Sequence, residues 1–168
     1  MNTKQSFACA NYILDEFHKR NEKLNNYELN KILYCAYGVH LILYEKTLFD
    51  EKIQAWNCGP VVPSILKEFK AYSLRKIEST SRAKIMEDFT GITITPDETH
   101  LNQMEYATRS MKISCTYWRL LQVGSSKENI PLKAWEKALN LTDKFLIKED
   151  IIQDFMPFID IIANDFFK

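Results

Sequence analysis

The sequence predicts a mainly helical fold, a single compact domain with a small β-hairpin. The chain has 168 residues, enough for one sizeable hydrophobic core and too few to make two domains the default. Apolar residues make up 46% of it and charged residues 26%, as in ordinary globular domains. Apolar residues also recur at intervals of three and four over several long segments, the pattern of amphipathic helices. We therefore expect residues 1–168 to form one helical domain.

Residues 3–19 are expected to form the first helix. Phe7, Ala10, Leu14 and Phe17 lie on one face at helical spacing. A polar loop, residues 21–26, follows.

The second helix, residues 27–44, is the one around which the others are expected to pack. From Leu29 to Leu43 its apolar positions step by four and three residues, which predicts one continuous buried stripe. His40 interrupts this stripe, and we expect it to bond a backbone carbonyl, with the Gly59–Pro60 turn as a candidate, rather than to act in catalysis. Lys31 lies off the stripe and is expected to be solvated.

Residues 53–57 alternate between two faces, which favours a short extended segment. Gly59 and Pro60 are expected to end it, because glycine adopts backbone conformations closed to other residues and proline offers no N–H. Pro63 suits the first position of a third helix, which fades near residues 72–73.

The second half of the chain gives weaker patterns. A hairpin is expected over residues 83–95, with a turn at Thr90 and Gly91. A helix should follow residues 96–99, and Ser114 is expected to cap a separate short helix. Pro131 is expected to open the helix that holds Trp135.

The last helix, residues 148–167, has apolar side chains around most of its circumference. That surface must be buried, either in the core or against a partner. Pro157 removes one backbone hydrogen bond and should bend the helix.

The runs YELNKILYCAYGVHLILYEKTLF (residues 27–49) and IQAWNCGPVVPSILKEFK (residues 53–70) resemble the Panacea domain, found in prokaryotic and phage proteins. Both the residue types and their spacing match the pattern of that family. The matching positions are Leu29, Lys31, Ile32, Leu33, Tyr34, His40, Ala55, Trp56, Gly59, Pro60, Val61, Val62 and Pro63. The resemblance is strongest over residues 7–70. Near the end, PLKAWEKA with Trp135 is similar to a proline–tryptophan segment of the family, but the threonine–histidine pair expected before it is absent.

The resemblance implies an antitoxin of a toxin–antitoxin pair, which neutralises a cognate toxin encoded nearby by binding it directly. The expected partner-binding residues are Trp56, Pro60, Val61, Pro63, Lys67 and Lys70. The expected structural residues are Lys31, Tyr34, His40, Gly59 and Trp135. Trp56 is either a core anchor or an exposed binding residue. Residues 64–84 carry six basic and two acidic residues, which would suit an acidic toxin surface.

Two other functions fit the sequence. Some relatives of this kind resemble adaptors that deliver a bound protein to a protease. The second alternative is an enzyme with an unrecognised site centred on His40, although no catalytic motif occurs and we expect no enzyme activity.

Composition argues against several further classes. Basic and acidic residues are equal in number, so we expect no nucleic-acid partner. No apolar run reaches the length of a membrane span, and the four cysteines contain no C-x-x-C pair. We expect reduced, mostly buried cysteines, no metal, no cofactor, no membrane partner and a cytoplasmic protein.

Overall fold

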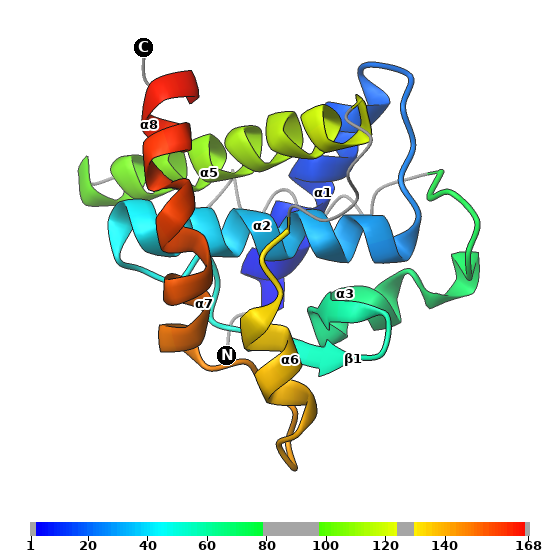
Figure 1. Cartoon of the computed structure of the whole chain (residues 1–168). Coiled ribbons are helices and arrows are strands. Elements are labelled where there is room, and N and C mark those ends of the chain that lie inside the picture. Colours follow the sequence, from blue (N-terminus) through cyan, green and yellow to red (C-terminus); the bar gives the residue numbers. More distant parts are fainter. Residues whose placement is uncertain (1–2, 79–97, 124–129, 167–168) are drawn as a thin grey trace.

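The computed structural model describes residues 3–78, 98–123 and 130–166. Two long helices lie side by side in the middle of the molecule, a third crosses behind them, and the C-terminal helices cross in front (Figure 1). In chain order the helices are α1 (Thr3–His18), α2 (Asn26–Tyr44), α3 (Pro63–Glu68), α5 (Glu98–Val123), α6 (Lys133–Leu139), α7 (Lys148–Phe155) and α8 (Ile159–Phe166). The expected mainly helical fold is confirmed.

Helix α2 is the centre of the core. Asn25 caps its start by accepting a hydrogen bond from the Glu28 N–H at 2.8 Å. At its end Glu45 takes a left-handed conformation, with φ at 56°, and donates its N–H to Leu41 O. Fourteen of its 19 residues are buried, so the helix is covered on nearly every side and not along one stripe as its periodicity suggested. Helices α1, α3, α5 and α7 pack against it.

Helix α5 is continuous, and the expected break at Ser114 is wrong. Ser114 lies inside the helix, where it is buried and donates its hydroxyl to Ile32 O of α2 at 2.8 Å. A serine that points at a neighbouring helix does not compete with its own backbone for hydrogen bonds. It therefore joins two helices and starts none.

The sheet has two antiparallel strands, β1 (Gln54–Trp56) and β2 (Gly59–Val61). The extended segment at residues 53–57 was expected, but the chain does not leave the extended conformation at Gly59 and Pro60. It turns back and pairs, with Ala55 opposite Pro60. The hairpin expected over residues 83–95 lies outside the described residues.

The C-terminal segment bends where Pro157 interrupts it. Helix α7 ends at Phe155, a 3-10 turn η2 (Met156–Phe158) contains Pro157, and α8 begins at Ile159. The bend allows α7 to pack on α2, while Phe158 of η2 meets Tyr117 of α5 edge-on and α8 crosses in front of α5 (Figure 1). Helix α6 begins at Lys133, two residues after the proline that was expected to open it.

Candidate functional site

The hairpin carries Trp56 at the end of β1. Trp56 pairs with Gly59, and Asn57 and Cys58 form the turn between them. Gly59 has a φ of 124°, in the left-handed region that only glycine adopts without strain. The Trp56 side chain is 45% exposed, while Ala55, on the opposite face of the strand, is fully buried. The alternation of the strand thus leaves one large aromatic side chain at the surface.

The free edge of β1 is covered by a segment from late in the chain. The Ala55 N–H donates to Lys144 O at 2.7 Å, and the Leu146 N–H donates to Ile53 O at 2.9 Å. These two bonds add a short extended segment beside β1, opposite β2. Because both edges of β1 are paired, the backbone that carries Trp56 is fixed.

The Trp56 residue itself is held at two points. Its indole Nε1 donates to Gln54 Oε1 at 2.8 Å, and its carbonyl oxygen accepts a hydrogen bond from Trp135 Nε1 of α6 at 2.8 Å. Gln54 in turn donates from Nε2 to Asp143 O at 3.0 Å. An exposed aromatic ring that is already fixed loses little conformational entropy when a partner covers it.

Two buried asparagines tie the end of the hairpin and α3 to α2. Asn30 Oδ1 accepts from the Val62 N–H at 2.8 Å, and Asn30 Nδ2 donates to Asn26 O at 2.9 Å. Asn26 Nδ2 donates to Leu66 O at 2.8 Å. These bonds satisfy the Val62 N–H, at the start of α3, and the Leu66 carbonyl, near its end. They thereby fix α3 against the central helix.

A buried carboxylate supports the start of α3. Glu51 is 5% exposed and accepts hydrogen bonds from the Ser64 N–H at 3.0 Å, from the Ser64 hydroxyl, and from the Ser6 hydroxyl at 3.0 Å. A negative charge is favourable at this pole of a helix, and the three donors offset the cost of burying it. Glu51 therefore joins α1, the loop before β1 and α3.

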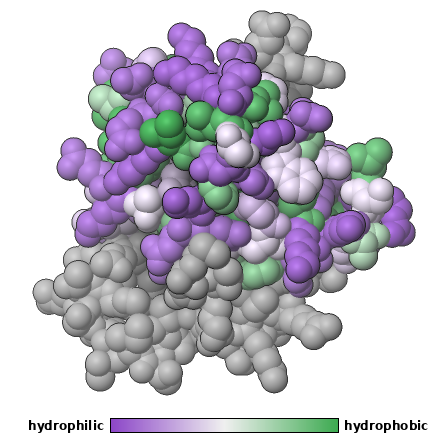
Figure 2. All heavy atoms as spheres, turned by 90° about the horizontal axis from the view of Figure 1, so that it is seen from below, coloured by the Kyte–Doolittle hydropathy of each residue, from purple (hydrophilic) through white to green (hydrophobic). Residues whose placement is uncertain are grey.

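The expected partner-binding residues differ in how far their side chains are buried. Trp56, Lys67 and Lys70 are exposed, Pro63 is half-buried, and Pro60 and Val61 are buried. The buried pair shapes the turn beneath the exposed residues. Seen from the side of α6 and the hairpin, the described surface is mostly hydrophilic with small separate hydrophobic patches (Figure 2).

The segment after the hairpin is basic and partly unpaired. Lys76 forms an ion pair with Glu28 at 2.7 Å, and Arg75 bonds backbone carbonyls of its own turn. Lys67 and Lys70 form no ion pair with any residue that the structure describes, and both are exposed. Two lysines are thus available on the face of α3 and the short 3-10 turn η1 (Lys70–Tyr72).

Lys31 and Tyr34 lie beneath this surface. A Cβ atom on Gly59 would lie 3.5 Å from Lys31 Cε, so the aliphatic part of the lysine covers the glycine. Lys31 is accordingly half-buried, where a solvated side chain was expected. Tyr34 is fully buried, and its ring meets that of Phe155 edge-on at 5.4 Å.

His40 does not reach the hairpin. Its Nδ1 lies 2.9 Å from Ser110 Oγ of α5, and the Ser110 hydroxyl donates to Tyr106 O at 3.0 Å. The serine hydrogen is thus committed to the carbonyl, so Nδ1 carries the proton and donates to Ser110. The expected carbonyl partner for His40 is therefore wrong, because residue 40 lies near the far end of α2 from the hairpin. Burial, and to a smaller extent Lys46, lowers the pKa of His40 to about 4.

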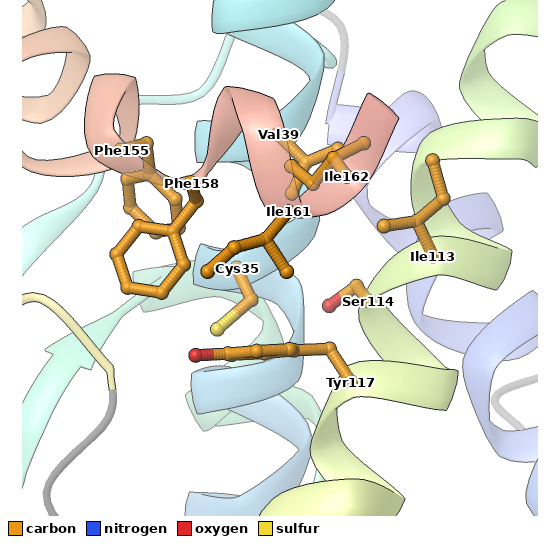
Figure 3. A pocket seen from close by; sticks show the side chains of 9 residues that line it. All are labelled: Cys35, Val39, Ile113, Ser114, Tyr117, Phe155, Phe158, Ile161 and Ile162. Carbon is orange, nitrogen blue, oxygen red and sulfur yellow. The ribbon is translucent and has the colours of Figure 1, made fainter. Parts of the chain in front are cut away.

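The C-terminal helices divide between core and surface. Ile151, Phe155 and Ile162 are buried, whereas Ile161 and Met156 are 45% and 46% exposed. In Figure 3 Ile161 of α8 points toward Cys35 of α2 and Tyr117 of α5, across an apolar cleft. The cleft encloses about 20 Å³, room for no more than a water-sized group, and its lining is apolar. It is a packing gap and not a ligand site.

The site depends on buried polar residues that the sequence did not single out: Asn26, Asn30, Glu51 and Asp154. Asp154 of α7 accepts the Ala134 N–H at 2.8 Å and so caps α6, whose own N-cap residue offers no side-chain bond. The sequence contains a pattern that could have predicted the burial of two of these residues, Asn26 and Asn30. Asn26 and Asn30 are four residues apart and adjoin the apolar stripe of α2, which predicts that both face the interior.

The family model of the antitoxin SocA-like Panacea domain matches residues 29–148, more than half of the chain. The chain belongs to this family. The match includes most of α2, the hairpin with Trp56, α3, α5 and α6. The hairpin and the segment paired with its second edge therefore belong to the Panacea domain. An antitoxin role is thereby supported at the level of the family.

Antitoxin SocA of Caulobacter vibrioides (strain NA1000 / CB15N) is 34% identical to the chain over 64 residues. These residues cover 38% of this chain and 34% of that antitoxin. The similarity thus spans about a third of the length of that relative. No solved structure matches the chain.

The described residues contain no group of three or more His, Cys, Asp or Glu side chains that could hold a metal ion. All four cysteines are free; Cys9, Cys35 and Cys115 are buried, and Cys58 is half-buried in the hairpin turn. Burial raises the pKa of the Cys9 and Cys35 thiols to about 12, so neither is a reactive thiolate near neutral pH. Within the described ranges no helix is both long and apolar enough to cross a membrane.

Proposed function

We propose that this Panacea domain is an antitoxin that neutralises a cognate toxin, encoded by a neighbouring gene, through direct binding. The observation that carries the proposal is the exposed and fixed side chain of Trp56. Large aromatic residues on fixed backbone are the commonest anchors of protein interfaces. Membership of the family supplies the kind of partner, a toxin.

The proposed contact surface consists of Trp56, Pro63, Lys67 and Lys70. Pro60 and Val61 support it from beneath, and Trp135 fixes the Trp56 carbonyl. The two unpaired lysines suit an acidic patch on the toxin. At the rim of an interface such charges act mainly on the association rate, and salt screens them.

The first test is a rescue experiment with the adjacent reading frame. Expression of that frame alone should arrest growth, and coexpression with this protein should restore growth and yield a complex that copurifies. Restored growth with loss of the partner protein would indicate delivery to a protease instead. A neighbour that does not arrest growth, or that does not bind, would refute the proposal.

The second test concerns the surface. Trp56→Ala should weaken the complex by about 2 kcal/mol or more, roughly 30-fold in Kd. Tyr106→Ala is the matched control, because Tyr106 is also an exposed aromatic residue, 37% exposed against 45% for Trp56, but lies on α5 beside Tyr44, at the far end of α2 from the hairpin. Equal effects of the two substitutions would refute Trp56 as the anchor.

The charge of the surface is tested by a double substitution. Lys67→Glu with Lys70→Glu should slow association and remove most of its salt dependence. Both side chains are exposed, so the thermal stability should stay within about 1 kcal/mol of the parent protein. An unchanged association rate at low salt would exclude these lysines from the interface.

An enzyme centred on His40 receives no support from the geometry. The side chain is 6% exposed, its Nδ1 is used by Ser110, and it lines neither the apolar cleft nor the pocket beside α6 described below. Its role is to join α2 to α5.

A further inference from the structure

A second concave site lies between the start of α6 and the end of α7. The pocket has a volume of about 450 Å³ and is lined by residues of both helices and of the segment before α6. Helix α6 also carries Trp135, which bonds the Trp56 carbonyl. The pocket and the hairpin are thus positioned by the same helix.

Asp154 provides a buried acceptor in this pocket. Its side chain is 8% exposed, and Oδ2 accepts the Ala134 N–H at 2.8 Å. Within the described part of the chain, Oδ1 has no hydrogen-bond or ion-pair partner. Asp154 lines the pocket, so Oδ1 is open to a donor that enters, and a charge-assisted hydrogen bond to a carboxylate is stronger than one between neutral groups.

Among the residues described, the Tyr34 hydroxyl is a second unsatisfied polar atom near α7, and Tyr34 itself does not line the pocket. The hydroxyl of Tyr34 is buried without a hydrogen-bond partner among the residues described. The Tyr34 ring packs on Phe155, the residue that follows Asp154 in α7, and burial and then the charge of Asp154 raise the pKa of Tyr34. The phenol oxygen can accept one further hydrogen bond as well as donate one.

The remaining charges at the pocket do not neutralise Asp154. Lys137 is paired with Asp150 at 3.1 Å, on the rim. Lys133 also borders the pocket, but its side chain is exposed and forms no ion pair with a described residue. The carboxylate therefore has no internal counter-charge in direct contact.

The shape and the lining favour a lysine side chain over other cations. An arginine fork binds best to both oxygens of a carboxylate, and here Oδ2 is already used by Ala134. A compact ammonium group needs a single open oxygen and can donate to a second acceptor. Pro131, Leu132 and Pro157 supply an apolar wall for its four-carbon stem.

We propose that this pocket binds a primary ammonium group, and that the bound toxin supplies it as a lysine side chain seated against Asp154. The proposal about the source of the lysine rests on the proposed antitoxin function. The proposal about the pocket does not, and the two are tested separately.

The pocket is tested without the toxin. Nα-acetyl-lysine methylamide is titrated into the isotopically labelled full chain, and amide shifts are followed by NMR. The expected result is a saturable shift at Ala134 and its neighbours. The norleucine analogue, which has the same stem without the ammonium group, should give none.

Two variants locate the effect. Asp154→Asn retains an oxygen for the Ala134 N–H and removes the charge, so the lysine probe should lose its saturable shift while α6 stays capped. Asp160→Asn makes the same change of charge at an exposed position of α8 and should leave the probe's binding unchanged. No saturable shift in the parent protein, or equal shifts with both analogues, would overturn the pocket whatever the toxin does.

The source of the lysine is tested on the complex. Asp154→Asn should raise the Kd for the copurified toxin at least tenfold, and Asp160→Asn should leave it unchanged. An unchanged Kd in Asp154→Asn, with the probe still bound by the parent protein, would overturn the assignment to the toxin. Failure of the toxin to bind the parent protein would instead count against the proposed function.

Discussion

The contact of α2 with α7 at Gly38 gives a sharp prediction about stability. Helix α7 packs on α2 at Gly38, and a Cβ atom built there would lie 2.3 Å from Phe155 Cδ2 and 2.4 Å from Cε2. Carbon atoms in contact are normally about 3.5–4.0 Å apart. Gly38→Ala therefore requires the Phe155 ring, or α7 as a whole, to move by about 1 Å or more.

The ring has little freedom to move. Phe155 is 3% exposed and packs against Tyr34 at 5.4 Å and Phe158 at 6.2 Å between ring centroids. Overpacking of this kind costs about 1–3 kcal/mol or more, and alanine recovers at most about 1 kcal/mol over glycine within a helix. We expect a net loss of about 1–3 kcal/mol, and a fall in Tm of about 2–4 °C for each kcal/mol.

Urea unfolding, followed by circular dichroism, measures the loss. Phe155→Leu alone should cost about 1–2 kcal/mol because it leaves a gap. In the Gly38→Ala background the same change relieves the clash, so the double variant should be more stable than the sum of the single effects by about 1 kcal/mol or more. A stabilised Gly38→Ala, or additivity within about 0.5 kcal/mol, would refute the packing argument.

Three further predictions concern residues that join the elements. The pKa of His40 is lowered from its ordinary value of 6.5 to about 4, so the folded state disfavours the protonated ring. The free energy of unfolding should therefore be highest above pH 6.5 and fall by about 2–3 kcal/mol as the pH drops toward 4. Urea titrations at several pH values measure this dependence, which should be weaker in His40→Gln. Asn30→Ala leaves the Val62 N–H unpaired and should cost about 1–3 kcal/mol in a thermal melt, and Asn30→Asp should cost at least as much because it buries a carboxylate oxygen against Asn26 O and Oδ1. Trp135→Phe should lower stability by about 1 kcal/mol and speed hydrogen exchange in the hairpin; an unchanged exchange rate would show that the bond to the Trp56 carbonyl does not brace the turn.

The sequence predicted what depends on local pattern. The bounds of α1 and α2 agree with the expected helices within one residue, because apolar spacing is a local signal. Helix α3 begins at Pro63 as expected but ends at Glu68, and the chain continues as the 3-10 turn η1 up to Tyr72, where the helix was expected to fade. The prediction that Ser114 caps a separate helix was wrong because a serine inside a helix cannot be told from a cap by its local sequence. The strand β2 was missed because Gly59 and Pro60 mark a turn but do not indicate whether the chain pairs after it.

The depth of the site residues was less predictable. The two faces of β1 predicted that one of Ala55 and Trp56 would be exposed, but the choice depends on which side faces α2. His40 was expected to bond a backbone carbonyl, with the Gly59–Pro60 turn as a candidate, whereas the partner that the fold provides is the Ser110 hydroxyl of α5. The third segment beside β1, with Leu146 bonded to Ile53, is a long-range pairing that no local pattern reports.

That long-range pairing also sets the order in which the molecule is completed. During synthesis the two strands of the hairpin are made early, but the backbone of β1 has no partner on its second edge until Lys144 and Leu146 have been added. At about 5–20 residues per second the interval is roughly 4–17 s. A nascent chain in that interval carries Trp56 on a hairpin that is braced on one side alone. The finished contact surface therefore requires the chain as far as Leu146, and a product of translation that stops before Lys144 lacks the second pairing of β1.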